Sequence, residues 1–194
     1  MANNASDGAA SIREWLDLKM VTGRYSGGLV SELVQHMEHR TAHVFSILDE
    51  IGDLEGSPNS RGRNTKPAGP FKGALLAGLW HKHYFQASFL PKNIENYWKS
   101  GEFPDRIKAI LGDLKHLTQQ KAGQIAHAYV MDGYRERSQS GEITGEWIIF
   151  ARQNDVNYYL TLGSHTEGDE AIRQRVLDCC AEFPNLLICQ GSEG

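Results

Sequence analysis

The chain has 194 residues, of which 40% are hydrophobic and 23% charged, a composition typical of one folded domain with a substantial core. The formal net charge of −4 argues against a broadly basic protein that coats nucleic acid, although a local basic patch is compatible with it. No run of about 18 apolar residues occurs, so no membrane span is expected, and the first residues lack the basic and apolar parts of a secretory signal.

Residues 1–51 are predicted to form an N-terminal helical segment. A short helix is expected from Ser11, a capping residue with Glu14 three positions later. A longer helix is predicted over 30–51, because apolar residues recur there every seven positions. The members of this stripe are Val30, Met37, Val44 and Ile51. The stripe packs either on the main sheet or on a partner chain, and in the second case it supports a homodimer.

Residues 52–70 are predicted to be a flexible loop, because Gly, Pro, Ser and Asn dominate and apolar residues are nearly absent. Arg61, Arg63 and Lys66 give this loop the densest positive charge in its surroundings. It is either a solvated linker or a lid that meets a polyanion such as RNA. The loop separates the helical segment from residues 71–194, which we interpret as an α+β catalytic domain.

The middle of the chain alternates strand and helix patterns. Aromatic and apolar residues predict a strand at least from Leu79 to Phe89. Helices are predicted from Asp105 and from Thr118, because both residue types cap helix N-termini.

The last third is rich in strand-forming residues, and two strands are predicted to join in a hairpin at Asn154-Asp155. A helix within 166–183 and a short strand at "NLLIC" (185–189) complete the prediction. The fold class is therefore α+β, with N-terminal helices followed by a small antiparallel sheet with intervening helices.

Three cysteines lie near the C-terminus, at Cys179, Cys180 and Cys189. Adjacent cysteines rarely pair with each other, and an odd number is a poor disulfide framework. We expect them to be small buried hydrophobic side chains, and we expect a cytoplasmic location.

The stretch "GLWHKHYF" (78–85) concentrates titratable side chains in an apolar run. On a strand, His81 and His83 face one side and Lys82 faces the other. If the second hairpin strand continues unbroken, one of its faces carries polar side chains: Asn157, Tyr159, Thr161 and His165. The two histidines are either hydrogen-bonded structural residues, metal ligands or acid–base catalysts.

The metal interpretation has a specific weakness. Two histidines separated by one residue, completed by His165, are a possible zinc ligand set. However, "YFQAS" after His83 lacks the carboxylate of a cupin-type site. A second group, His36, His39 and His43, lies on one helical side, but "HRTAH" lacks the glutamate of a zincin. We therefore predict no metal and no cofactor.

The acid–base interpretation is metal-independent cleavage of RNA that leaves a 2′,3′-cyclic phosphate. Such a reaction needs a base for the 2′-hydroxyl proton, an acid for the leaving 5′-oxygen, and a cation for the phosphoryl charge. We assign the base to His81 or His83, the acid to His165 and the cation to Lys82 or Arg152. Tyr159 and Thr161 would position the phosphate, and Trp80, Tyr84 or Tyr158 could stack on a base.

Helices followed by a small antiparallel sheet, a histidine-bearing strand and the late hairpin "EWIIFARQNDVNYYLTLGSH" resemble the barnase–EndoU–colicin–RelE group of small ribonucleases over residues 71–190. The resemblance implies an endoribonuclease of toxin, phage or plasmid type. His81 or His83 resembles the group's histidine on an early strand, and Thr161 and His165 resemble polar residues of its late hairpin. The acidic net charge departs from the basic character of such toxins, which implies a regulatory or inhibitory protein partner.

Two alternatives to the ribonuclease stay open. The chain could be a non-enzymatic interaction module that docks a partner through the 30–51 helix, or a metalloenzyme with histidine ligands.

Overall fold

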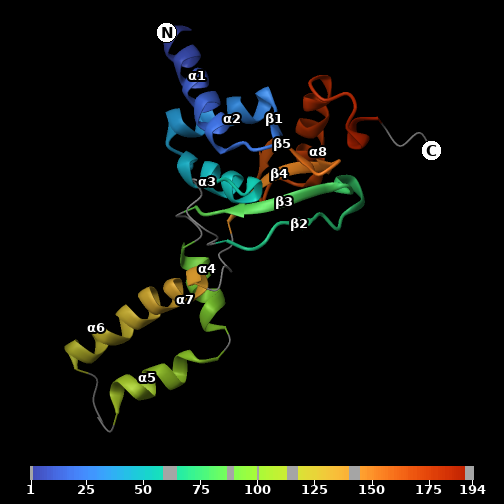
Figure 1. Ribbon diagram of the computed structural model, residues 1–194. Helices are drawn as coiled ribbons and strands as arrows, with labels where there is room; N and C mark the ends of the chain where they lie inside the picture. Colours follow the sequence, from blue (N-terminus) through green and yellow to red (C-terminus); the bar gives the residue numbers. More distant parts are fainter. Residues whose placement is uncertain are drawn as a thin grey trace.

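The computed structural model describes residues 2–58, 65–86, 90–99, 101–112, 118–139 and 145–190. Within these ranges the predicted α+β class is confirmed: a five-stranded mixed sheet of order β1-β5-β4-β3-β2 carries helices on both faces (Figure 1). The strands are β1 (Arg24–Tyr25), β2 (Gly69–Pro70), β3 (Leu79–Tyr84), β4 (Glu146–Gln153) and β5 (Val156–Gly163). Among these five described strands, the β1–β5 pair is parallel, and the pairs β2–β3, β3–β4 and β4–β5 are antiparallel.

One face of the sheet is covered by the N-terminal helices (Figure 1). These are α1 (Ala2–Lys19), α2 (Gly27–His39) and α3 (Val44–Glu55). The predicted continuous helix over 30–51 is wrong, because Arg40 adopts a left-handed conformation with φ 53° that ends α2. His43 then caps α3, its ring accepting a hydrogen bond from the Ser46 amide.

The seven-residue stripe is therefore divided between two helices that both pack on this face. Val30, Val44 and Ile51 are at most 5% exposed and belong to the chain's own core. Met37, the fourth residue of the stripe, is partly buried against the same core. The stripe thus serves the chain's own core, and a homodimer through the 30–51 segment stays a prediction.

The opposite face is covered by α8 (Asp169–Asp178) and the segment after it. Ile172 and Val176 of α8 pack there on Leu79 and Ile149 of the sheet. The predicted strand at 185–189 is wrong, since Leu187–Cys189 form a 3-10 turn.

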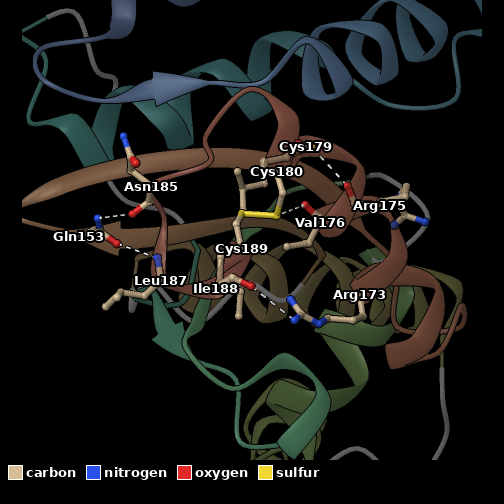
Figure 2. Close-up of a disulfide and its surroundings, with 11 residues drawn as sticks. Gln153, Arg173, Arg175, Val176, Cys179, Cys180, Asn185, Leu187, Ile188 and Cys189 are labelled. Atoms are coloured by element: carbon tan, nitrogen blue, oxygen red, sulfur yellow. Dashed lines mark hydrogen bonds between the residues drawn. A yellow bond between two sulfur atoms is a disulfide. The ribbon is translucent and has the colours of Figure 1, made fainter. Parts of the chain in front are cut away.

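This turn brings Cys189 to Cys180, and the two form a disulfide with a Cα–Cα distance of 5.3 Å (Figure 2). The expectation that these cysteines are free thiols is thereby corrected, whereas Cys179 is a buried free thiol. The closed segment is also tied to β4, because Leu187 donates a backbone hydrogen bond to the side chain of Gln153. A disulfide is more typical of oxidising compartments, and the cytoplasmic location stays a prediction.

The chain between β3 and β4 forms a helical arm that extends away from the sheet (Figure 1). Its helices are α4 (Leu90–Trp98), α5 (Phe103–Leu111), α6 (Gln119–His127) and α7 (Gly133–Gln139), with a π-helical turn at Ala128–Asp132. Thr118 caps α6 as predicted, by accepting a hydrogen bond from the Lys121 amide. The α5 helix begins at Phe103 rather than Asp105, and β3 ends at Tyr84, while the predicted strand end at 87–89 lies outside the described residues.

The predicted hairpin at Asn154-Asp155 is confirmed, and both residues have the positive φ that a tight hairpin turn requires. Farther along, the ladder contains a β-bulge: Phe150 pairs with Tyr159, whereas Ile149 pairs with Thr161. The extra residue in β5 reverses the alternation there. Tyr159 therefore faces α1–α3 while Thr161 faces α8, and the predicted shared face is wrong. No helix in the described ranges has the length and apolar character needed to cross a membrane.

Candidate functional site

Three histidines converge at one end of the sheet, on the α8 side. His81 and His83 lie on this face of β3, and His165 lies in the loop after β5. The ring centroids of His81 and His83 are 5.5 Å apart, and those of His83 and His165 are 5.6 Å apart. The register explains the approach, because His83 pairs with Trp147 and Trp147 pairs with Gly163, two residues before His165.

Two aromatic side chains enclose this three-histidine cluster. The Trp147 ring lies 4.1 Å from that of His165 and 5.5 Å from that of His81. The Phe71 ring lies 4.7 Å from that of His81. No sequence pattern indicates either residue, because only the strand register places Trp147 opposite His83 and Phe71 beside His81.

One backbone carbonyl orients two of the imidazoles. The Gly145 oxygen lies 2.8 Å from His83 Nδ1 and 2.9 Å from His165 Nε2. The Gly145 amide is farther from His83 Nδ1, at 3.3 Å, so the tautomer that donates Nδ1–H to the carbonyl is favoured. A Cβ atom at position 145 would collide with the Tyr84 carbonyl, which explains the glycine.

Burial keeps the inner two rings neutral. His83 is 6% exposed, and burial lowers its pKa to about 4 despite the hydrogen bond to Gly145. His81 is half-buried, and its pKa is lowered by burial and then by the charges of His165 and Lys66. His165 is exposed. The cluster thus combines neutral imidazoles, which can accept a proton, with one ring that reaches solvent.

Two buried polar atoms of the cluster make no hydrogen bond within the part of the chain that the structure describes: His81 Nδ1 and Trp147 Nε1. Leaving such an atom unpaired costs about 1–3 kcal/mol. Unpaired buried polar groups are few in native proteins, and each one needs an explanation, such as a functional role or an ordered water or ion. These two atoms therefore mark the cluster as a candidate binding site.

A cation stands beside the cluster. Lys66 is exposed, and its charge acts on both His81 and His83. The backbone that carries it is held in place, because the Lys66 carbonyl accepts from Lys82 Nζ at 2.9 Å and Thr65 Oγ1 donates to the His83 carbonyl at 2.9 Å. Arg61 and Arg63 of the same predicted loop lie outside the described residues.

Lys82 does not join the histidines, which corrects its assignment as a phosphate-stabilising cation. Alternation along β3 sends it to the opposite face, where it is 2% exposed. Its Nζ lies 3.0 Å from Glu50 Oε2 and donates to Thr65 Oγ1 at 2.7 Å. The ammonium group is thus bound to buried partners on the other face of the sheet and cannot reach a substrate at the three-histidine cluster.

Tyr159 and Arg152 also lie away from the cluster. Tyr159 is fully buried beneath α1–α3 and donates its hydroxyl hydrogen to Glu55 at 2.7 Å. Arg152 stands 4.2 Å over the Trp80 ring near the hairpin turn. Because both serve the packing of the other face, Tyr159 cannot position the phosphate and Arg152 cannot stabilise its charge, and both predicted roles are wrong.

Thr161 belongs to a separate polar network. Its hydroxyl donates to Glu32 at 2.7 Å and accepts from Arg175 Nε at 3.0 Å. The second histidine group is divided as well: His36 contacts Thr41, and His43 caps α3. Across the described ranges, no three His, Cys, Asp or Glu side chains are arranged to hold a metal ion.

Comparisons of the chain with protein-family models, with curated proteins and with solved structures give no match. The role of the three-histidine cluster is therefore inferred from its geometry and chemistry.

Proposed function

We propose that the chain is a metal-independent endoribonuclease whose active site is the three-histidine cluster. The observation that carries this proposal is the approach of His81, His83 and His165 to ring contact, with Lys66 beside them. Acid–base cleavage of a phosphodiester needs two groups that exchange protons and a cation near the phosphate, and these side chains supply both kinds.

The roles follow from burial and hydrogen bonding. His81, neutral and half-buried, is the base that removes the 2′-hydroxyl proton. The 2′-oxygen attacks phosphorus, and the bond to the 5′-oxygen breaks as His165 gives that oxygen a proton. Lys66 and the Trp147 indole N–H stabilise the phosphoryl oxygens. His83, fixed by Gly145, positions the rings on either side of it.

The products are a 2′,3′-cyclic phosphate and a free 5′-hydroxyl, so atoms and protons balance. His81 ends protonated and His165 ends neutral. Before the next cycle, water must take the proton from His81 and return one to His165, and the exposure of His165 allows this exchange. The rings of Phe71 and Trp147 offer apolar faces on which a base of single-stranded RNA can stack. A regulatory or inhibitory protein partner stays a prediction.

The test uses purified protein and total RNA in EDTA, with detection of 2′,3′-cyclic phosphate ends. His81→Ala and His165→Ala should each lower the cleavage rate by about a hundredfold or more. His127→Ala is the matched control, since this histidine is exposed on α6 in the arm and should leave the rate unchanged. Cleavage that is indifferent to both cluster variants would reject the proposal.

A further inference from the structure

An open cleft of about 370 Å³ lies between α2, the ends of β3 and β5, the start of β4, and α8. Its charged and polar walls include Glu32, His36, Tyr84, Glu146, Glu167 and Arg175. It adjoins the three-histidine cluster but is separate from it, the two being linked where the His165 amide donates to Glu146 Oε2 at 2.9 Å.

The cleft carries three carboxylates and one guanidinium group. Arg175 is already engaged, with Nη1 at 2.7 Å from Glu167 and Nε at 3.2 Å from Glu32. Backbone amides hold both carboxylates in place, Leu162 donating to Glu32 at 2.8 Å and Ser164 to Glu167 at 2.6 Å. Glu32 and Glu167 are thus held in position before any ligand binds. Glu146 adds a third carboxylate, which forms no ion pair with Arg175, the guanidinium group of the cleft.

An unpartnered phenol faces the cleft and is a second sign of a ligand. The Tyr84 side chain is 2% exposed and lines the cleft, and its hydroxyl is not among the fully buried unpaired atoms, so it opens on the cleft. In the described ranges this hydroxyl has no hydrogen bond to another residue. Burial raises its pKa, and the charges of Glu146, Glu32 and Glu167 raise it further. The hydroxyl is therefore a neutral donor and acceptor surrounded by carboxylates, without a partner of its own.

We infer that this cleft binds an organic cation with a guanidinium or primary ammonium head. The head donates one N–H to the Tyr84 hydroxyl and another to the Glu146 carboxylate, and the stem occupies the open part of the cleft. Burial lowers the pKa of His36, so this ring is neutral and does not repel the cation. The volume falls within the range of about 300–1,000 Å³ found for small-ligand sites.

The same head group could belong to a free metabolite or to an arginine side chain of a protein. Calorimetric titration with agmatine represents the first source, and titration with N-acetyl-arginine amide represents the second. N-acetyl-citrulline amide, which has nearly the same shape without the charge, is the control probe. All titrations are made without RNA, so their result is independent of the ribonuclease proposal.

Binding of either cationic probe, with at least about tenfold weaker binding of the citrulline probe, supports the inference. Glu146→Gln and Tyr84→Phe should each weaken binding of the cation about tenfold. Glu38→Gln makes the same charge change on an exposed position of α2 outside the cleft and should leave binding unchanged. The inference is overturned if neither cation binds, or if folded Glu146→Gln and Tyr84→Phe proteins bind as the parent does.

Discussion

Replacement of Lys82 by methionine tests whether this lysine serves the core. Its Nζ lies 3.0 Å from Glu50, and the two side chains are 2% and 8% exposed. Methionine keeps the length of the chain but removes the charge, which leaves a carboxylate buried without its counter-ion. Breaking a buried pair in this way costs about 3–5 kcal/mol of unfolding free energy. For a protein of this size, that corresponds to a melting temperature lower by about 10 °C.

Urea unfolding followed by circular dichroism measures the loss, and two controls identify its cause. Lys108→Met removes an exposed pair with Asp105, so stability should change by less than about 0.5 kcal/mol. The double variant Lys82→Met/Glu50→Leu removes both buried charges and should recover most of the stability, because apolar replacements of a buried pair are often neutral.

An unchanged urea midpoint in Lys82→Met would refute the reasoning, since it would mean that the Glu50 carboxylate needs no cation. Full stability combined with loss of RNA cleavage would instead restore the catalytic role that the sequence pattern indicates for Lys82. Partial loss of cleavage in a folded variant is expected, because Lys82 holds the Lys66 carbonyl at 2.9 Å.

Three further predictions concern single interactions. The pKa of His83 is lowered from 6.5 to about 4, so between these pH values the unfolded chain binds more protons than the folded one. The free energy of unfolding should therefore fall by up to about 3 kcal/mol as the pH drops from 6.5 to about 4. Urea titrations of His83→Asn should lack this pH dependence. Cys180 and Cys189 are nine residues apart, and a disulfide that closes a loop of this length stabilises a protein by about 2–3 kcal/mol. Cys189→Ala should lower the free energy of unfolding by this amount. Dithiothreitol should destabilise the parent protein but not the variant. Tyr159→Phe removes the hydrogen bond that the hydroxyl donates to Glu55 and the one that it accepts from Asn157, and it should destabilise by about 1–2 kcal/mol with no change in RNA cleavage at 25 °C. A cleavage rate lowered more than about tenfold would contradict the placement of Tyr159.

The features that could be predicted from the sequence are local ones. The Asn154-Asp155 turn and the Thr118 cap depend on the conformational preferences of one or two residues, and both occur where expected. The face shared by His81 and His83 follows from the alternation of a single strand. The apolar pattern of the 30–51 segment correctly indicates core positions, although it does not reveal the break at Arg40.

The features that could not be predicted depend on contacts between distant segments. The bulge in β5 is visible only in its pairing with β4, and it separates Thr161 from Tyr159. The Cys180–Cys189 bond depends on a turn whose apolar residues resemble a strand. The approach of Gly145 to His83 and His165 joins three parts of the chain, so no short sequence pattern indicates it.

The placement of the helical arm has a consequence for how this chain can vary. The arm leaves β3 just after Tyr84 and returns just before Glu146, and these two residues face each other across the ladder. The pairing of β3 with β4 at this point does not depend on the length of the helical arm between them. Lengthening or shortening a long connection changes the entropy cost of closing the loop only slowly. The segment is therefore a natural place to accept insertions, deletions or an added module, while the strand register that brings the imidazoles together is preserved.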